Sequence, residues 1–275
     1  MKYLILVLAL TAMPSKAQQV STLVYNQTRD SIVVGDHLNV HRPIASITKL
    51  MTAMVALDHD SNLQRTIRMP GSNKIPGGVY TREELLTAML VRSDNGASDA
   101  IANDYPGGRK AFVRAMNTKA ELIGMTHTKF VDPSGLSVHN RSNAGSVGVL
   151  LKSAITYPFI KSSSVQKQIT IMNKRYSIVL DNTNKMLLYD FDEILLSKTG
   201  FTNASGWSVA LVLEKGDQTF SVVVLGARSR DERYTMTKNL INQYFQELTL
   251  EKEEEVVYNN ETKTIYQQIK DWLAK

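Results

Sequence analysis

Strand-like segments near the two ends of the chain enclose a long block of helix-like segments, and this order limits the fold more than any other feature of the sequence. Two short runs of alternating residues, 22–25 and 31–34, flank five polar residues and predict a β-hairpin. Near the other end, the β-forming runs 207–213 and 219–225 are joined through Gly216-Asp217, which is a hairpin signal. Strands that cluster together, instead of alternating one by one with helices, predict the α+β class.

Helical periodicity dominates the first part of the block between these strands. Leu50, Met54 and Leu57 share one face of a segment that begins at Ser46, and the segment 81–84 (TREE) has the pattern of a capping box. We expect the strand groups to join in one antiparallel sheet that is flanked by helices and covered on one face by the last helix. The further helices are expected at 96–102, 110–123, 146–155 and 232–245, and the further strands at 168–172, 176–180 and 194–198.

The first 17 residues have the features of a secretory signal. Lys2 supplies a basic start, residues 3–13 form an apolar run too short to span a bilayer, and residues 15–17 (SKA) offer small residues for cleavage after Ala17. The alternative is a buried N-terminal strand. We therefore expect residues 1–17 to be a signal peptide and the mature protein to be periplasmic.

Composition excludes several classes of site. The chain has no cysteine, which excludes cysteine nucleophiles and thiolate metal sites. The net charge of +6 is ordinary for a soluble protein, and we expect no nucleic-acid partner. His37 and His41 lie four residues apart, as in many zinc sites, but no glutamate follows His37, so surface histidines are the simpler interpretation. We expect neither a metal nor another cofactor.

Three short motifs occur in a fixed order: Ser46-Ile47-Thr48-Lys49, then Ser93-Asp94-Asn95, then Lys198-Thr199-Gly200. Each motif alone is weak evidence. Ser46 could equally be a helix cap, Asn95 a loop residue and Lys198 the solvated end of a strand. As an ordered set they are typical of penicillin-binding proteins and class A β-lactamases. The set therefore predicts serine acyl-transfer chemistry.

The first motif supplies a nucleophile and a base. Ser46 and Lys49 are three residues apart at a helix start, so their side chains lie on one face, one turn apart. A serine hydroxyl is a poor nucleophile unless a base takes its proton, and a lysine is a base only when it is neutral. Burial and a second cation both lower the pKa of a lysine, and Lys198 is a candidate for that cation. The unpaired N–H groups of the first helical turn can help to bind an oxyanion.

The other two motifs supply groups that contact the substrate. Ser93 and Asn95, where a helix ends and a loop begins, are placed to relay a proton to the leaving amine and to hold the substrate's peptide group. Lys198 and Thr199, at the end of an apolar strand, are placed to bind a terminal carboxylate. Gly200 would let the substrate backbone lie close to the strand, and the N–H of Phe201 would be the second oxyanion donor.

Longer segments around these motifs resemble one family, the low-molecular-mass penicillin-binding proteins, which comprise D-alanyl-D-alanine carboxypeptidases and endopeptidases. The resemblance covers about residues 20–248, so we assign residues 18–248 to a serine D,D-peptidase domain. It is greatest for the D,D-endopeptidase branch of this family. It implies a β-lactamase/transpeptidase-like fold with an all-helical subdomain, peptidoglycan stem peptides as substrates, and β-lactams as covalent inhibitors of Ser46. The segments that carry it are 42–54 (RPIASITKLMTAM), 105–108 (YPGG), 130–136 (FVDPSGL) and 198–203 (KTGFTN).

Three alternatives stay open on the sequence. A D,D-carboxypeptidase that removes terminal D-Ala is the nearest; the chain lacks the C-terminal β domain of the larger carboxypeptidases, but its Ser-Asp-Asn motif differs from the Ser-Glu-Asn of the endopeptidase branch. A class A β-lactamase needs a deacylating glutamate, and only Glu121 and Glu193 lie between Asn95 and Lys198, neither in the expected Glu-x-x-Leu-Asn pattern. A non-catalytic wall-binding protein would be expected to have lost Ser46 or Lys49.

The tail, residues 249–275, differs in composition from the rest. After a run of charges at 251–255, Ile265, Ile269 and Trp272 recur at helical spacing. This pattern predicts a short amphipathic helix. Such a helix either packs on the body of the protein or lies on a membrane surface, and the preceding glutamates disfavour an anionic membrane as the partner.

Overall fold

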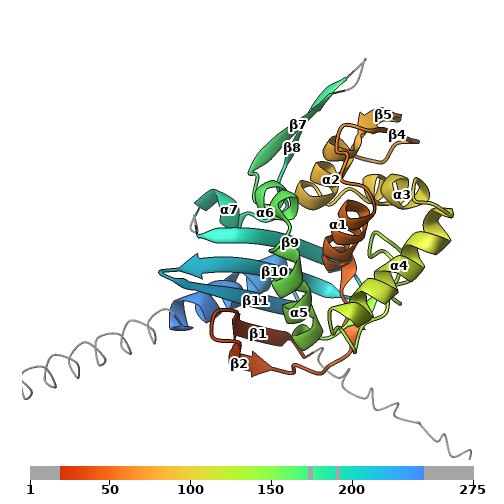
Figure 1. Cartoon of the computed structure of the whole chain (residues 1–275). Helices are drawn as coiled ribbons and strands as arrows, with labels where there is room; N and C mark the ends of the chain where they lie inside the picture. The colour runs from red at the N-terminus through yellow and green to blue at the C-terminus, as the bar shows by residue number, and fades with distance from the viewer. Residues whose placement is uncertain (1–18, 173–175, 190–192, 245–275) are drawn as a thin grey trace, which may run out of the picture.

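A five-stranded antiparallel sheet forms the centre of the computed structural model, with its strands in the order β2-β1-β11-β10-β9 (Figure 1). The first hairpin of the chain joins the last one because β1 pairs with β11. The α+β class predicted from the sequence is confirmed, and β9 is an edge strand of this sheet. The strands are β1 (Ser21–Asn26), β2 (Ser31–Asp36), β9 (Ile194–Thr202), β10 (Gly206–Lys215) and β11 (Gln218–Ala227).

The structure describes residues 19–172, 176–189 and 193–244. The expected signal peptide at 1–17 and the tail at 249–275 lie outside these residues, so both stay predictions. Within the described residues, no helix combines the length and the apolar character needed to cross a membrane.

Both faces of the sheet are buried, which explains why its strands read as continuous apolar runs. Successive residues of a strand point to opposite faces, so Leu211 packs in one cluster and Val212 in the other. On one face, α5 (Ala144–Ala154) packs directly on β1, β10 and β11. On the other face, a helix that includes residues 230–244 packs through Ile241 and Tyr244. The predicted last helix therefore covers one face, as expected.

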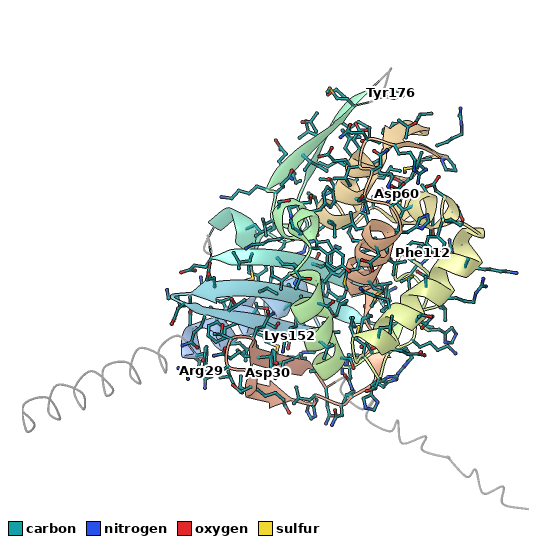
Figure 2. The ribbon with its side chains drawn as sticks, in the orientation of Figure 1. Arg29, Asp30, Asp60, Phe112, Lys152 and Tyr176 are labelled. Carbon is teal, nitrogen blue, oxygen red and sulfur yellow. The ribbon has the colours of Figure 1, made fainter. Side chains whose placement is uncertain are left out.

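A helical subdomain stands beside the edge strand β9. Three helices, α2 (Arg82–Val91), α3 (Asn95–Asn103) and α4 (Gly108–Leu122), pack around α1 (Thr48–His59), and Phe112 of α4 is completely buried there (Figure 2). Arg82 is also buried and donates hydrogen bonds to the carbonyl oxygens of Ala56 and Asp60, at 2.8 and 2.7 Å. This arrangement fixes the end of α1 to the start of α2.

The strands are not all in one sheet, contrary to the sequence prediction. β7 (Gln168–Met172) and β8 (Ser177–Asp181) form a separate hairpin that extends away from the body, with Tyr176 near its tip (Figure 2). The sequence pattern placed these strands correctly but could not show their partners. The elements that it missed are β3 (Arg42–Pro43), β4 (Thr66–Met69), β5 (Gly78–Thr81), β6 (Arg141–Ser142), η1 (Ala45–Ile47), α6 (Pro158–Ser164) and α7 (Met186–Tyr189).

Two polar contacts fix the N-terminal part of the chain to the rest of the fold. Arg42, which is buried, donates hydrogen bonds to the carbonyl oxygens of Leu225 and Gln19, so the chain that leads to Ser46 is fixed to β11. Asp30, in the turn between β1 and β2, forms an ion pair with Lys152 of α5 (Figure 2).

The backbone at Gly135 comes very close to the backbone that precedes Ser46. A Cβ atom at Gly135 would lie 1.9 Å from the carbonyl oxygen of Ala45, and the φ angle of Gly135 is +84°. Gly124 has nearly the same φ, +87°, but no atom lies within 4 Å of its Cβ position. The two glycines thus share a backbone conformation and differ in crowding.

We predict that Gly135→Ala costs much more stability than Gly124→Ala. The left-handed conformation alone should cost about 1 kcal/mol in either variant, whereas the clash at residue 135 should bring the total to roughly 2–5 kcal/mol. Thermal unfolding of the two variants beside the wild type measures the difference. Equal losses would show that the close approach to Ala45 does not matter.

Candidate active site

Ser46 lies in the 3-10 turn η1, directly before α1, and its hydroxyl contacts Lys49. Lys49 Nζ lies 2.9 Å from Ser46 Oγ, and the lysine side chain is completely buried. The preceding residue, Ala45, has a φ of 46°, a conformation that is uncommon outside glycine. The predicted pairing of this serine and lysine at a helix start is therefore what the structure contains.

Lys49 has three acceptors around its amino group. Besides Ser46 Oγ, these are Asn95 Oδ1 at 2.8 Å and the carbonyl oxygen of Ser134. Neither of the last two atoms can donate a hydrogen bond, so a neutral Lys49 keeps its two N–H groups for them. Its lone pair then faces Ser46, whose hydroxyl donates to it. The arrangement thus orients a neutral lysine to receive the serine proton.

Burial is the main reason that Lys49 can be neutral near physiological pH. It lowers the pKa of Lys49 from 10.5 to about 7, together with the positive charge of Lys74, whereas the carboxylates of Asp132, Asp94 and Asp99 oppose the shift. Lys74 is thus a second cation near Lys49 that the sequence did not indicate, and Lys198, the candidate from the sequence, also interacts electrostatically with Lys49. Burial, and next the charge of Lys49, hold the pKa of Lys198 itself well below its ordinary value.

The segment 130–136 builds the loop that supplies the Ser134 carbonyl. Asp132 accepts hydrogen bonds from the backbone N–H groups of Ser134, Gly135 and Ser137. Thr52 of α1 donates to the carbonyl oxygen of Pro133 at 2.6 Å. The sequence indicated this segment only through the family resemblance. In the structure, the segment positions the Ser134 carbonyl oxygen as an acceptor for Lys49.

Ser93 and Asn95 lie at the junction of α2 and α3. Ser93 has a φ of 58°, and Asp94 caps α3 by accepting a hydrogen bond from the N–H of Ala97 at 2.8 Å. Asn95 is the first residue of α3 and not a loop residue, which corrects the sequence prediction. The cap fixes Asn95 against the start of a helix, and its side chain reaches Lys49.

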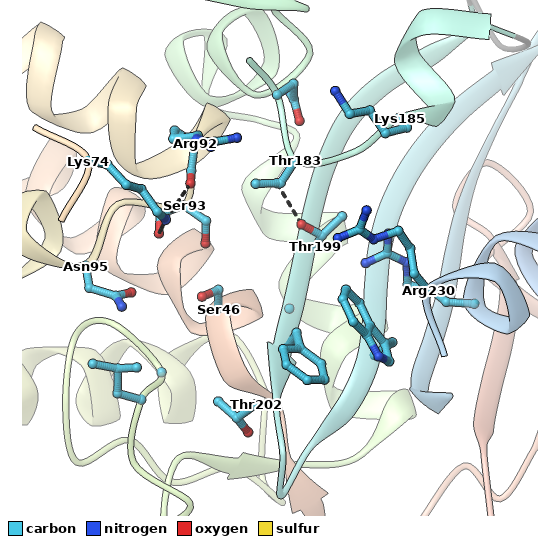
Figure 3. Close-up of a pocket in the computed structure, with 17 residues that line it drawn as sticks. Ser46, Lys74, Arg92, Ser93, Asn95, Thr183, Lys185, Thr199, Thr202 and Arg230 are labelled. Atoms are coloured by element: carbon cyan, nitrogen blue, oxygen red, sulfur yellow. Dashed lines mark hydrogen bonds between the residues drawn. The ribbon is translucent and has the colours of Figure 1, made fainter. Parts of the chain in front are cut away.

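A turn formed by residues 71–75 clamps this junction from outside. Lys74 Nζ donates to the carbonyl oxygens of Arg92 and Ser93, at 3.0 and 3.2 Å (Figure 3). Ser72 Oγ donates to Asp94 Oδ2 at 2.6 Å. Sequence analysis missed Lys74 because it belongs to none of the three motifs. The only sequence signal for Lys74 was its place in a polar segment shortly before the predicted helix at 81, and many lysines occur in such segments.

The third motif lies within β9 and not at its end, because the strand continues to Thr202. Lys198 is buried and donates to the carbonyl oxygen of Thr199 at 3.1 Å, and Thr199 Oγ1 donates to Thr183 Oγ1 at 2.7 Å. A Cβ atom at Gly200 would lie 3.0 Å from the carbonyl oxygen of Ile44. Gly200 thus lies close to the chain that precedes Ser46, in addition to the substrate contact expected from the sequence.

A cleft of about 330 Å³ lies between β9 and the helical subdomain, with Ser46 at its centre (Figure 3). Ser93 and Asn95 line one side, and Thr199, Gly200 and Phe201 line the other. Lys49 and Lys198 are buried beneath it, so the structure brings all eight predicted site residues to one place. Sequence reasoning missed Thr183, Lys185, Trp207, Arg230 and Arg233 among the residues that line the cleft.

The cleft has no features of a metal centre. Across the described residues, no three side chains of His, Cys, Asp or Glu come together as metal ligands would. His37 contacts Asp36 at 3.5 Å, and His41 contacts the carbonyl oxygen of His127, so the two histidines have separate partners.

Comparison with known proteins identifies relatives of this chain. Residues 9–229 match the model of the D-alanyl-D-alanine carboxypeptidase family. The D-alanyl-D-alanine endopeptidase of Escherichia coli K12 is 36% identical over 80% of this chain and 74% of its own length. The fold is that of Streptomyces K15 DD-transpeptidase, with a TM-score of 0.77 at 22% identity over 85% of this chain and all of that one. Penicillin-binding protein D2 of Listeria monocytogenes, solved in a cefotaxime-bound form, gives a TM-score of 0.72 at 25% identity over 81% of this chain and 95% of that one.

We predict that acylation of Ser46 by a fluorescent penicillin follows the neutral fraction of Lys49. The rate should fall about tenfold per pH unit below pH 7, because the protonated lysine cannot accept the serine proton. In Lys74→Met the loss of a neighbouring cation should raise the pKa of Lys49 and move the midpoint to higher pH, whereas Lys74→Arg should leave it in place. Ser46→Ala should take no label at any pH. An unshifted midpoint in Lys74→Met would contradict the electrostatic role of Lys74.

Proposed function

The chain belongs to the D-alanyl-D-alanine carboxypeptidase family and is a serine peptidase, and we propose that it acts mainly as a D,D-endopeptidase that cleaves the peptide cross-links of peptidoglycan. The observation that carries the chemistry is the buried contact between Ser46 Oγ and Lys49 Nζ, with the pKa of the lysine lowered to about 7. The relative from Escherichia coli, an endopeptidase at 36% identity, supports the choice of substrate.

Acylation begins when Ser46 gives its proton to neutral Lys49 and its oxygen attacks the carbonyl carbon of a D-Ala residue. The negative charge that develops on the carbonyl oxygen is stabilised by backbone N–H groups, for which those of Ser46 and Phe201 are our candidates. The C–N bond then breaks, and the leaving amine takes the proton from Lys49, directly or through the hydroxyl of Ser93. The products of this step are a Ser46 ester and a free amine.

The cleft supports a substrate that lies between β9 and the helical subdomain. Asn95 and the edge of β9 flank Ser46 on opposite sides, so a peptide bond held between them would present its carbonyl to Oγ (Figure 3). The carboxylate of the residue that leaves would face Thr199, next to the buried amino group of Lys198. These roles follow the sequence prediction for Asn95, Lys198 and Thr199.

Hydrolysis of the ester by water completes the reaction, and this step explains the expected inhibition by β-lactams. A β-lactam that acylates Ser46 keeps its amine on the same molecule, so the amine cannot diffuse away and the ester persists. No glutamate is among the described residues that line the cleft, and a class A β-lactamase requires one to activate water for deacylation. We therefore propose that β-lactams form long-lived adducts with Ser46.

We predict faster cleavage of cross-linked dimers than of pentapeptides. Purified mature protein should split the D-Ala–meso-diaminopimelate bond of dimeric muropeptides and remove the terminal D-Ala of pentapeptides more slowly. Chromatography of digests of both substrates gives the two rates, and Ser46→Ala, which lacks the nucleophile, should cleave neither. Rapid trimming of pentapeptides while dimers remain intact would make the protein a carboxypeptidase instead.

We propose that the enzyme acts in the periplasm, because residues 1–17 have the pattern of an export signal and stem peptides lie outside the cytoplasm. The prediction is that protein recovered from the periplasm begins at Gln18, which mass spectrometry of its N-terminal peptide measures. A protein that keeps residues 1–17 after fractionation would contradict cleavage at this site.

A further inference from the structure

The cleft around Ser46 carries a one-sided charge. Five of the residues that line it are cationic, and none of the described lining residues is an aspartate or a glutamate. Lys74 and Arg92 lie on the side of the helical subdomain, where Lys74 holds the carbonyl oxygens of Arg92 and Ser93. Lys185 and Arg230 lie on the side of the sheet, beyond Thr199 (Figure 3), and Arg233 is the fifth cation of the lining.

Two of the sheet-side cations share one aromatic ring. The guanidinium carbons of Arg230 and Arg233 lie 5.1 and 5.6 Å from the centre of the Trp207 ring, and Phe201 stacks on the same indole at 4.1 Å between ring centres. Arg233 is 3% exposed. Its burial, and to a smaller extent the like charge of Arg230, lower the pKa of Arg233 to about 10. Among the described residues, no carboxylate forms an ion pair with either arginine or with Lys185.

The acyl-transfer step assigns no role to Lys185 or Arg230, the two outermost cations of the cleft. We assign the carboxylate beside the cleaved bond to Thr199 and Lys198, and Arg233 is buried with its guanidinium near the Trp207 ring. Arg230 is exposed at the mouth of the cleft, and Lys185 is half-buried on the same side, above Thr183 and Thr199 in the view of Figure 3. Cations at the exit of a cleft attract anionic groups that extend beyond the reacting bond.

The two substrates of this enzyme class differ in such groups. A pentapeptide releases free D-Ala, which has a single carboxylate. A cross-linked dimer releases a whole stem peptide, whose D-centred diaminopimelate carboxylate takes the place of that of D-Ala and whose backbone carries further carboxylates. Only the dimer can therefore place a second negative charge near Lys185 and Arg230.

We propose that Lys185 and Arg230 form a subsite for a second carboxylate of the departing stem peptide and so favour dimers over pentapeptides. This inference rests on the proposed endopeptidase function and adds the residues that select the substrate. Trp207 holds Arg230 in position through the cation–π contact, which limits the conformational freedom that binding would otherwise remove.

The test compares Lys185→Gln, Arg230→Gln and the double variant with the wild type on three reactions. With dimeric muropeptides, kcat/KM should fall about fivefold in each single variant and about 20-fold in the double variant, mainly through KM. Cleavage of pentapeptides and acylation by a fluorescent penicillin should change less than about twofold, because neither ligand reaches the subsite. Arg228→Gln, which removes an exposed arginine that pairs with Glu232 and does not line the cleft, is the matched control and should behave as the wild type.

A change in the substrate provides an independent check. Dimers whose stem-peptide carboxylates are amidated lack the proposed second charge, so wild type and double variant should cleave them at the same rate. If the wild type cleaves native dimers and the double variant does so equally well, the subsite is refuted while the endopeptidase function stands. If the variants lose penicillin acylation to the same degree as dimer cleavage, the two residues act on folding or acylation and the subsite is also refuted. If the wild type cleaves no dimer, both proposals fail.

Discussion

The contact between a fully buried lysine and a serine hydroxyl is the interaction on which the rest of this structure depends. An ammonium group is stable in water and costly to bury, so removal of Lys49 from solvent favours its neutral form. A neutral amine needs its two hydrogens satisfied and its lone pair aimed at the nucleophile. Asn95 and the Ser134 carbonyl meet the first need, and their positions leave Ser46 as the partner of the lone pair.

Much of the geometry around the cleft supports these two acceptors. Asn95 is held because Asp94 caps α3 and because the turn at 71–75 clamps the junction that precedes it. The Ser134 carbonyl is held because Asp132 collects the N–H groups of its loop and Thr52 ties that loop to α1. The close approach of Gly135 and Gly200 to the chain before Ser46 brings the loop, the edge strand and the nucleophile within reach of one another.

The sequence predicted the reacting residues better than the environment that tunes them. Ser46 and Lys49 are three residues apart at the start of a helix, so their spacing alone placed them together, and the apolar runs of β9–β11 predicted a sheet flanked by helices. Lys74 is different, because its effect on Lys49 depends on a tertiary contact between a turn and the end of α2. The interaction of Lys198 with Lys49 was expected from the sequence, whereas the additional charge of Lys74 was not. The partner strands of β7 and β8 were likewise not readable, since alternation gives the faces of a strand and not its neighbours.

One charge distribution serves both the base and the substrate. Every carboxylate near Lys49 raises the pKa of the lysine, as Asp132 does, and would repel the carboxylate of a stem peptide. Cations have the opposite effect on both, so a cleft lined by lysine and arginine keeps the base neutral and attracts the anion. A glutamate placed to activate water for hydrolysis of the acyl-enzyme would likewise raise the pKa of Lys49 and repel the substrate carboxylate. An enzyme that relies on a neutral lysine and an anionic substrate thus gains little from an acidic group in its cleft. Because no such group activates water for deacylation, the enzyme remains susceptible to acylating agents whose leaving group stays attached.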